Sequence, residues 1–511
     1  MKLKKTLKLF WSKIQDIKIY KMNKHFIVFV FTMGCVFCEA QHFGEQGHPM
    51  TRQTLSLEVL KYWHPKDTKR LEVFANAHEI LKSSKDRTFS DLSTNASFKQ
   101  LALENNYRLT GGPLLGQVHP FGISVWLRTL YPAKVEIEVQ NENFVKRFGP
   151  IFTDKMQDLS AVVEIDGLKP STKYSYKVFV DSEEMTTDQI TSFTTVSDRQ
   201  DGEMRLAFGS CPHRWGLGNQ LLWNEIANRG NKAMILLGDI AVQDRNDHFG
   251  MHRSDYLLRD FLPAWRTFSS QIPVYASWDD HDYFDNDLSG IPDSFTDLDR
   301  KGVREVFVNS WVNRAYGEDG EGIYMRDRIG PFDIVMTDNR YFREGKPSSF
   351  LGEKQMKWLK EELLNCDAPF IILSCGSMWS DYVSNGKDSW GVNDPDGREE
   401  ILNFIEENEI KGVILISGDR HGARGFTIPR KSGFQFYEFE PGSLGARVGP
   451  PAKKPEWITQ LFGIDGQFAF GELTFQPADE DPSVIFRLIT DEGEILYEKE
   501  IHRSELTPSN Y

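Results

Sequence analysis

The sequence predicts an α/β catalytic domain that follows a small all-β sandwich, and two patterns carry this prediction. From about residue 203 to residue 416, short apolar runs alternate with amphipathic segments, which is typical of buried strands separated by helices. Residues 107–200 instead alternate apolar and polar side chains with a period of two, as in an antiparallel sandwich. We therefore assign residues 107–200 to the sandwich and residues 201–511 to the catalytic domain.

The catalytic domain is expected to contain six buried strands with helices between them. The apolar runs begin at Arg205, Ala233, Pro273, Asp333, Phe370 and Gly412. The helices are expected at 219–229, 255–268, 301–313, 354–365 and 398–409. After His421 the helical pattern stops, and strand-like runs begin at Phe434, Phe468 and Val484.

The segments before the catalytic domain have different characters. Residues 41–106 contain helical patches at 55–62 and 71–81 and form a helical N-terminal segment without recognisable chemistry. In the sandwich, the stretch from Gly167 to Val178 resembles the corner before a late strand of fibronectin type III domains. We therefore expect a fibronectin III-like β-sandwich, a module that usually serves as a spacer or a lid.

The N-terminus has the pattern of an export signal. Lysines between positions 2 and 24 precede an apolar stretch from Phe26 to Phe37, and small residues at Cys38 and Ala40 suit cleavage before Gln41. Residues 1–40 are thus predicted to be a signal peptide, and the protein to be exported to the periplasm, the medium or the cell surface. The alternatives are a retained anchor and lipidation of a cysteine in this leader. No later segment has an apolar run long enough to predict a transmembrane helix.

The net charge argues against a nucleic-acid-binding protein, and the cysteine spacing argues against disulfide bonds. The formal net charge is −14, and because the first 40 residues hold eight lysines against two acids, the remainder carries −20. Such an acidic body argues against DNA or RNA as the main partner, since phosphate backbones would repel it. Three cysteines follow the leader, and the spacing of Cys366 and Cys375 around an apolar run leads us to expect no disulfides.

Polar clusters follow all six apolar runs, and these clusters contain the candidate site. They are Gly209–Cys211, Gly238–Asp239, Trp278–Asp282, Thr337–Arg340, Ser374–Ser377 and Ser417–His421. In open α/β sheets the functional site lies at the carboxyl ends of the strands, so these clusters are expected to meet at one rim. The residues that they are expected to bring to this rim are Cys211, Asp239, Asp280, His281, Asp419 and His421. Thiolate, carboxylate and imidazole together suit transition metals.

Each candidate also has a plainer explanation. Taken alone, Asp239 could be a turn residue, Cys211 a small buried hydrophobe, and Asp419 a helix cap. The three carboxylates beside His281 in Asp279–Asp282 are harder to explain without metal, because they repel one another unless cations neutralise them.

Two arginines are the candidates for holding phosphate. Guanidinium groups match phosphate oxygens bidentately, which suits Arg340 and Arg343, although an ion pair with Asp338 or a nearby acid would also explain either one. Trp379 and Asp381 are expected to line the substrate pocket or simply to pack. His248 and His252 have ligand spacing, but no apolar strand precedes them, so we expect surface residues.

The order of these clusters resembles the alkaline phosphatase D family of calcineurin-like metallophosphoesterases, which is related to the purple acid phosphatases. The resemblance spans roughly residues 107–500, and the run Trp278–Asp282 is its most specific part. It implies a four-layer αββα sandwich with Cys211 and His421 on a first metal, Asp239 as a bridge, and Asp280 and Asp419 on a second metal. The family often has a tyrosine ligand where this chain has Val242, so a Tyr–Fe(III) bond is not expected.

The function that follows is hydrolysis of a small phosphate ester, monoester or diester, by a water activated between two metal ions. The ions would be Ca, Mg, Mn, Zn or Fe, in divalent or mixed-valence states. His281 would assist the leaving group, and Arg340 and Arg343 would hold the phosphate, with Trp379 as a further substrate contact. The alternatives are a phospholipase-like or nucleotide phosphodiesterase activity, or a non-catalytic binding protein.

Overall fold

The computed structural model describes residues 56–508 apart from 187–188, 190, 345–348, 381–387 and 447–451. The chain divides into two compact units, Met1–Pro49 and Met50–Tyr511, and all described residues belong to the second. The predicted signal peptide therefore lies outside the described residues, as does Asp381. In the described part, no helix is long and apolar enough to cross a membrane.

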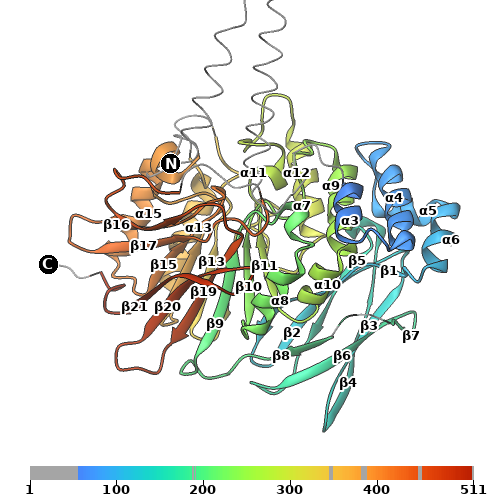
Figure 1. The fold of residues 1–511 in the computed structure, drawn as a ribbon, viewed down its shortest axis with the longest axis horizontal. Helices are drawn as coiled ribbons and strands as arrows, with labels where there is room; N and C mark the ends of the chain where they lie inside the picture. The colour runs from blue at the N-terminus through green and yellow to red at the C-terminus, as the bar shows by residue number, and fades with distance from the viewer. Residues whose placement is uncertain are drawn as a thin grey trace, which may run out of the picture. The chain divides into compact units, whose positions relative to one another are not determined.

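Four short helices form the N-terminal segment of the described chain (Figure 1). They are α3 (Ser56–Trp63), α4 (Thr68–Lys82), α5 (Phe89–Thr94) and α6 (Ala96–Glu104). The carboxylate of Asp67 caps α4, and the amide oxygen of Asn95 caps α6, each by accepting a backbone N–H of the first turn. Both helical patches predicted from the sequence are confirmed, while α5 and α6 are additional.

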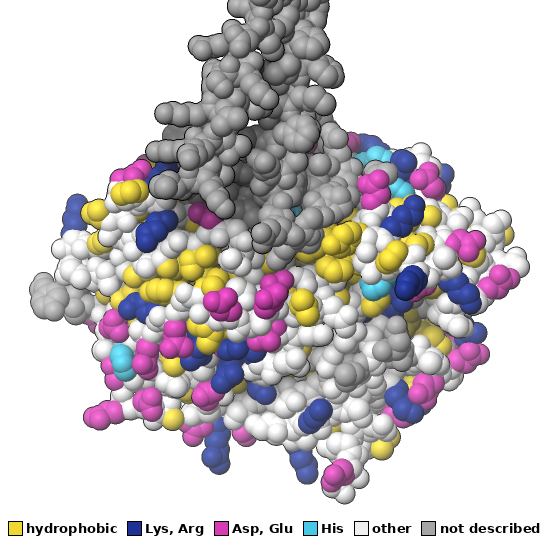
Figure 2. All heavy atoms as spheres, in the orientation of Figure 1, with side chains coloured by type: hydrophobic (Ala, Val, Ile, Leu, Met, Phe, Trp, Pro, Cys, Tyr) yellow, Lys and Arg dark blue, Asp and Glu magenta, His cyan; other side chains and the backbone are white. Residues whose placement is uncertain are grey.

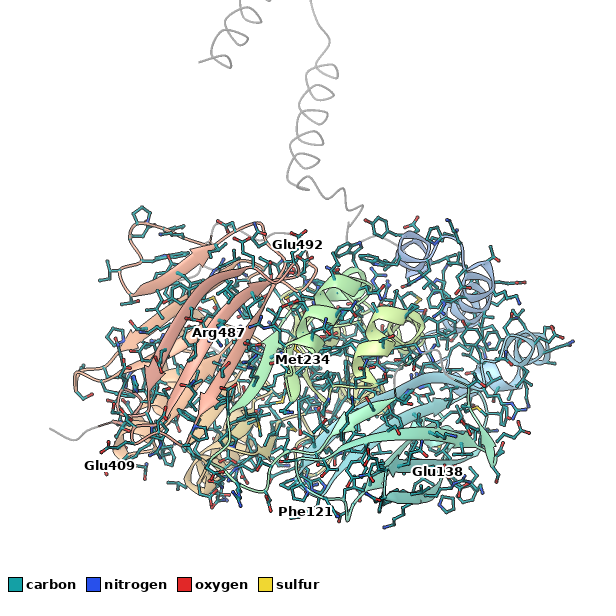
Figure 3. The ribbon with its side chains drawn as sticks, turned by 60° about the horizontal axis from the view of Figure 1, so that its bottom comes forward. Phe121, Glu138, Met234, Glu409, Arg487 and Glu492 are labelled. Atoms are coloured by element: carbon teal, nitrogen blue, oxygen red, sulfur yellow. The ribbon has the colours of Figure 1, made fainter. Side chains whose placement is uncertain are left out.

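The all-β segment consists of two antiparallel sheets that share one apolar core. The first has the order β1-β2-β5 and the second β4-β3-β6-β7, with β8 paired to β6. The strands are β1 (Leu109–His119), β2 (Gly122–Thr129), β3 (Lys134–Asn141), β4 (Phe144–Phe152), β5 (Ser160–Ile165), β6 (Lys173–Val180), β7 (Glu183–Glu184) and β8 (Ser192–Thr194). Strand β3 shows the expected alternation of burial, and its Glu138, labelled in Figure 3, is partly exposed.

Strand β2 departs from the half-buried pattern, because every one of its residues is buried. Its second face packs against the following domain: Trp126 Nε1 donates to the carbonyl of Asn309 over 3.1 Å. The buried Arg128 guanidinium stacks on Phe89 and donates to Ser310 Oγ over 3.1 Å. The sandwich is therefore joined to its neighbours by a buried interface.

Two mixed sheets form the catalytic domain and share a core. The first has the order β11-β10-β9-β19-β20-β21, and the second β12-β13-β14-β15-β17-β16-β18. The strands are β9 (Met204–Gly209), β10 (Ala233–Leu237), β11 (Val274–Ser277), β12 (Met325–Ile329), β13 (Phe332–Met336), β14 (Phe370–Ser374), β15 (Val413–Ile416), β16 (Ala423–Pro429), β17 (Gln435–Glu440), β18 (Gln460–Ile464), β19 (Ala469–Gln476), β20 (Ser483–Thr490) and β21 (Ile495–His502). All six predicted strands and the three later ones are confirmed.

Helices cover the outer faces of these sheets, so that the domain is an α/β sandwich (Figure 1). The helices are α7 (His213–Gly216), α8 (Gln220–Asn228), α9 (Phe249–Phe261), α10 (Pro263–Ser269), α11 (Asp280–Tyr283), α12 (Asp297–Val308), α13 (Gly352–Asn365), α14 (Trp390–Asn393) and α15 (Pro395–Glu407). Alternate residues of a strand serve both faces: Ile235 lies in the core between the sheets, whereas Met234, labelled in Figure 3, lies in the core beneath the helices.

Two details differ from the sequence-based expectation. The helix predicted at 255–268 is two helices, because Pro263 lacks an N–H and begins α10 at its first turn. The prediction that His252 lies on the surface is wrong: it is buried in α9, and its Nε2 lies 2.8 Å from the Asn246 carbonyl. His248 is half-buried and caps α9 by accepting the N–H of Met251.

Candidate metal centre

The carboxyl ends of four strands meet at one place, although the strands belong to two sheets. Strands β9, β10 and β11 deliver Cys211, Asp239 and Asp280 from the first sheet, and β15 delivers Asp419 from the second. The N–H of Cys211 donates to the Gly238 carbonyl over 3.0 Å, which holds the first two strand ends together. The rim predicted from the sequence is therefore shared by both sheets.

Five residues of this rim have a left-handed backbone that non-glycine residues seldom adopt. The φ angles are 53° at Cys211, 45° at His213, 54° at Asp239, 78° at Asp419 and 60° at His421. Such conformations are unfavourable by about 1–3 kcal/mol each and are concentrated at functional sites. Here they turn five polar side chains toward one another directly after the strands end.

Three groups of side chains place their ligand atoms within 4.8 Å of one another. The first is Cys211, His213, Asp239 and His421; the second is Asp239, Asp280 and His281; the third is Asp279, Asp280 and Asp419. Asp239 belongs to two groups, as does Asp280. All six candidates predicted from the sequence are thus brought together, and His213 and Asp279 join them.

The hydrogen bonding of these residues fits metal ions. Within the described chain, the buried atoms Asp239 Oδ1, Asp279 Oδ2 and His213 Nδ1 have no hydrogen-bond partner. Buried polar atoms are nearly always paired, so three orphaned atoms in one cluster indicate a missing partner. Thiolate, imidazole and carboxylate donors at this spacing suit transition-metal ions.

The electrostatics of the cluster lead to the same conclusion. Burial and the neighbouring Asp280 and Asp419 carboxylates raise the pKa of Asp279 to about 8, although Arg340 opposes the shift. Burial likewise raises the pKa of Asp419 to about 6, and that of Asp239 well above its usual value. These carboxyl groups need either protons or cations to neutralise them, and cations would keep them ionised.

His213 is the ligand candidate that sequence reasoning missed. Its Nε2 lies 4.0 Å from Asp239 Oδ2, and its ring centroid lies 5.4 Å from that of His281 and 5.6 Å from that of His421. Burial lowers its pKa well below the usual value, so the ring is neutral and able to bind a metal. Its position two residues after Cys211, just beyond that polar cluster, was the available signal.

Asp282 has a structural role. Its carboxylate accepts the backbone N–H groups of Ile240, Ala241 and Val242 at 3.0 to 3.4 Å. It therefore holds the turn that follows Asp239. Val242, where the resembling family often has a tyrosine, is completely buried in the apolar core.

His281 is oriented by the loop that follows Asp239. Its Nδ1 lies 2.5 Å from Asp244 Oδ1 and 3.1 Å from Gln243 Nε2. Because the Asp244 carboxylate can only accept, Nδ1 carries the proton and Nε2 is left for the cluster. Burial alone would lower the pKa of His281, but the Asp239, Asp280 and Asp244 carboxylates raise it well above its usual value.

The guanidinium groups of both predicted phosphate-binding arginines pair with acids other than Asp338, whose carboxylate instead accepts the backbone N–H of Arg340 over 3.0 Å. Arg340 is completely buried, with Nε 2.5 Å from Asp279 Oδ1 and Nη2 2.9 Å from Asp388 Oδ2. Arg343 holds Asp388 bidentately at 2.8 and 2.6 Å. Arg340 Nη1 has no hydrogen-bond partner among the described residues, so it is the atom of this pair left for a substrate.

Trp379 is placed as a packing residue rather than as a substrate contact. It is completely buried, stacks on Trp390 with ring centroids 5.0 Å apart, and donates to the Ile416 carbonyl over 3.4 Å. The packing alternative therefore explains Trp379, and the prediction that it binds substrate is corrected.

Cys211, Cys366 and Cys375 are free thiols.

A cavity of about 510 Å³ lies beside the cluster. Its walls include Asp287, Ile291, Arg300 and Arg343. The N–H of Asp287 donates to Asp280 Oδ2 over 2.6 Å, so the cavity adjoins a ligand candidate directly. On the face shown in Figure 2, basic side chains are interspersed with acidic ones.

Comparisons with known proteins agree with this arrangement. Alkaline phosphatase D of Bacillus subtilis (strain 168) is 23% identical over 376 residues, which cover 62% of this chain and 61% of that protein. The chain thus spans less than two thirds of this curated relative. A domain of unknown function (DUF7800) matches residues 106–197.

Solved structures show the fold. A structure of PhoD superposes with a TM-score of 0.63 at 17% identity, over 77% of this chain and 92% of that chain. A purple acid phosphatase from yellow lupin (Lupinus luteus) seeds superposes with a TM-score of 0.55 at 13% identity, over 78% and 76%. The PhoD-like phosphatase model matches residues 206–462, half of the chain and every ligand candidate above, and the protein therefore belongs to the PhoD-like phosphatase family.

Proposed function

We propose that this protein hydrolyses phosphate esters at a centre of two metal ions. The observation that carries the proposal is the sharing of Asp239 between two adjacent groups of donors, which is the arrangement of a bridging carboxylate. When bound, two cations supply a nucleophilic water at neutral pH and neutralise the phosphoryl oxygens.

The chain's residues divide the remaining tasks. Cys211, His213 and His421 would hold one ion and Asp279, Asp280 and Asp419 the other, with Asp239 between them. His281 in its imidazolium form would deliver the Nε2 proton to the leaving oxygen, while Nδ1 keeps its proton in the contact with Asp244. Arg340 Nη1 would donate to a phosphoryl oxygen. Arg343 would support it through Asp388.

We extend the proposal to the parts of the chain around the site. Residues 201–511 would form a four-layer αββα metallophosphoesterase sandwich, residues 107–200 a fibronectin III-like module, and residues 1–40 an export signal that directs the protein out of the cytoplasm. The shared cores and outer helices support the first assignment, and the two packed sheets of the all-β segment support the second.

Metal removal tests the proposed activity. The purified full chain is treated with EDTA, and turnover of p-nitrophenyl phosphate and bis(p-nitrophenyl) phosphate is measured before and after addition of Ca, Mg, Mn, Zn or Fe. Activity that is lost on chelation and restored by one ion is expected, and elemental analysis should find about two ions per chain. Metal-independent turnover would refute the two-metal mechanism, and no turnover of either ester would leave the binding-protein alternative.

The comparison of the two esters also decides between monoester and diester chemistry. The cavity beside Asp287 and Arg343 has room for an organic group on the far side of the phosphate. We therefore expect the protein to hydrolyse both p-nitrophenyl phosphate and bis(p-nitrophenyl) phosphate.

Replacement of Asp244 by asparagine is expected to reduce kcat by about 10- to 100-fold. The neutral amide no longer stabilises the imidazolium of His281, which is the form that donates from Nε2 while Nδ1 stays protonated, so less of the enzyme can protonate the leaving oxygen. Steady-state kinetics should show the loss in kcat while KM changes little. An Asp247→Asn variant, on the same loop but paired with Lys85, is the control and should keep its kcat.

A further inference from the structure

The N-terminal helices lie outside both matched regions of the chain, 106–197 and 206–462, yet they contact the loops of the metal centre. Trp63 at the end of α3 donates from Nε1 to the Trp215 carbonyl over 2.9 Å. The two tryptophan rings pack with centroids 4.8 Å apart. Trp215 belongs to α7, whose first residue is the ligand candidate His213.

A buried carboxylate on α9 connects α3 to the rest of this region. Asp255 is completely buried and accepts the Ser56 hydroxyl over 2.7 Å. Arg245 holds it bidentately at 2.7 and 3.0 Å, and Arg214 Nη1 lies 3.8 Å away. Arg214 also donates to Ser56 Oγ over 3.1 Å, which closes the cluster. These four side chains, Ser56, Arg214, Arg245 and Asp255, are called the bracket below.

The bracket joins the two loops that complete the metal centre. Arg214 directly follows His213, which belongs to the first group of metal ligands. Arg245 directly follows Asp244, which orients His281. Since both arginines bind the same carboxylate, Asp255 sets the distance between a ligand-bearing loop and the loop that orients the catalytic histidine.

We propose that Asp255, held by Ser56 of α3, is a positioning residue for the metal centre, and that the N-terminal segment serves to complete this bracket. The inference rests on the proposed function only in that the centre binds metal. Groups that orient ligands from behind typically change metal affinity by about 10- to 100-fold when they are removed. The left-handed backbone of His213 makes its loop costly to hold in place, and a buried ion pair directly behind it supplies the necessary constraint.

A second ion pair on the same helix provides a matched control. Arg253 of α9 binds the buried Asp158 of the sandwich at 2.8 and 2.9 Å. Asp158 is 2% exposed and Asp255 is completely buried. Asp158 contacts neither loop of the metal centre in the described contacts, so Asp158→Asn and Asp255→Asn make the same chemical change in similar surroundings with different connections.

The experiment measures metal affinity directly, in the full chain and without turnover. Zn²⁺ and Mn²⁺ are each titrated alone into chelator-treated wild type, Asp255→Asn and Asp158→Asn, in competition with a fluorescent chelator, and Tm is recorded for each protein. Both variants are expected to have a lower Tm. Only Asp255→Asn is expected to bind metal more weakly, by about 10- to 100-fold.

The outcomes separate the inference from the proposed function. Unchanged affinity in Asp255→Asn, or an equal loss in both variants, overturns the positioning role. A wild type that binds metal but hydrolyses neither ester overturns the function and leaves the bracket intact, and a wild type that binds neither ion overturns both. If Asp255→Asn fails to fold, Ser56→Ala takes its place: it removes only one hydroxyl and should weaken metal binding in the same direction, whereas Ser56→Thr should restore it.

Discussion

Replacement of Asp239 by asparagine is expected to lower phosphate-ester turnover by about 1,000-fold or more, because the carboxylate shared by two groups of ligands loses its charge. The side chain keeps its size, and the residue keeps a left-handed backbone that asparagine tolerates well. The effect should therefore come from the metal centre rather than from the fold. Turnover of p-nitrophenyl phosphate at saturating metal is the measurement.

Thermal stability tests metal binding by the Asp239→Asn variant independently of turnover. In wild type, metal that binds only the folded state should stabilise it by about 2.7 kcal/mol at roughly 100 times the dissociation constant. Asp239→Asn should lose most of this gain, while its metal-free Tm stays the same or rises, because a buried carboxyl with a raised pKa has been removed. Asp319→Asn, at a side chain that is 85% exposed, is the control. Wild-type turnover in Asp239→Asn would refute the proposed centre.

Replacement of Arg340 by methionine is expected to reduce the free energy of unfolding by about 3–5 kcal/mol, because two buried carboxylates lose a partner. Arg340 is completely buried between Asp279 and Asp388. Asp279 lies in the metal cluster and already has a raised pKa, so loss of Arg340 adds repulsion where negative charge is densest. Urea denaturation of the metal-free protein measures the effect.

Arg343→Met is the matched comparison for Arg340→Met. Among the described acids, Arg343 pairs with Asp388, which keeps Arg340 as a partner, so Arg343→Met should reduce the free energy of unfolding by less. Bound metal should restore part of the free energy of unfolding that Arg340→Met loses, since a cation can replace the guanidinium beside Asp279. Equal losses in the two variants would show that Arg340 is not the central charge of this network. A rise in KM of the folded Arg340→Met protein would support its contact with phosphate.

Much of the catalytic domain was predictable because its strands are buried on both faces. Such strands appear as short continuous apolar runs, and a polar cluster directly after each run marks the strand end. That pattern was enough to select Cys211, Asp239, Asp280, Asp419 and His421, all of which meet in the structure.

The errors have a common physical origin. His252 was predicted at the surface because no apolar strand precedes it, yet it is buried in α9, which packs against α3 and α4 of the N-terminal segment. Trp379 was predicted as a substrate contact, but it stacks on Trp390 and donates to the Ile416 carbonyl at the end of β15. In both cases the surroundings of the side chain come from elements far away in the chain, and a local pattern contains no information about them.

The sequence by itself determined the positions of the strands along the chain, the polar clusters at their ends and the need for cations around Asp279–Asp282. These features depend on local periodicity and on the charge of neighbouring residues. Only the tertiary structure decided that the rim is shared by two sheets, that His213 joins it, and that Asp244 and Asp255 support it from behind. These contacts span 37 residues between Asp244 and His281 and 199 between Ser56 and Asp255. They depend on left-handed turns and on buried charge pairing, which exist only once the chain has folded.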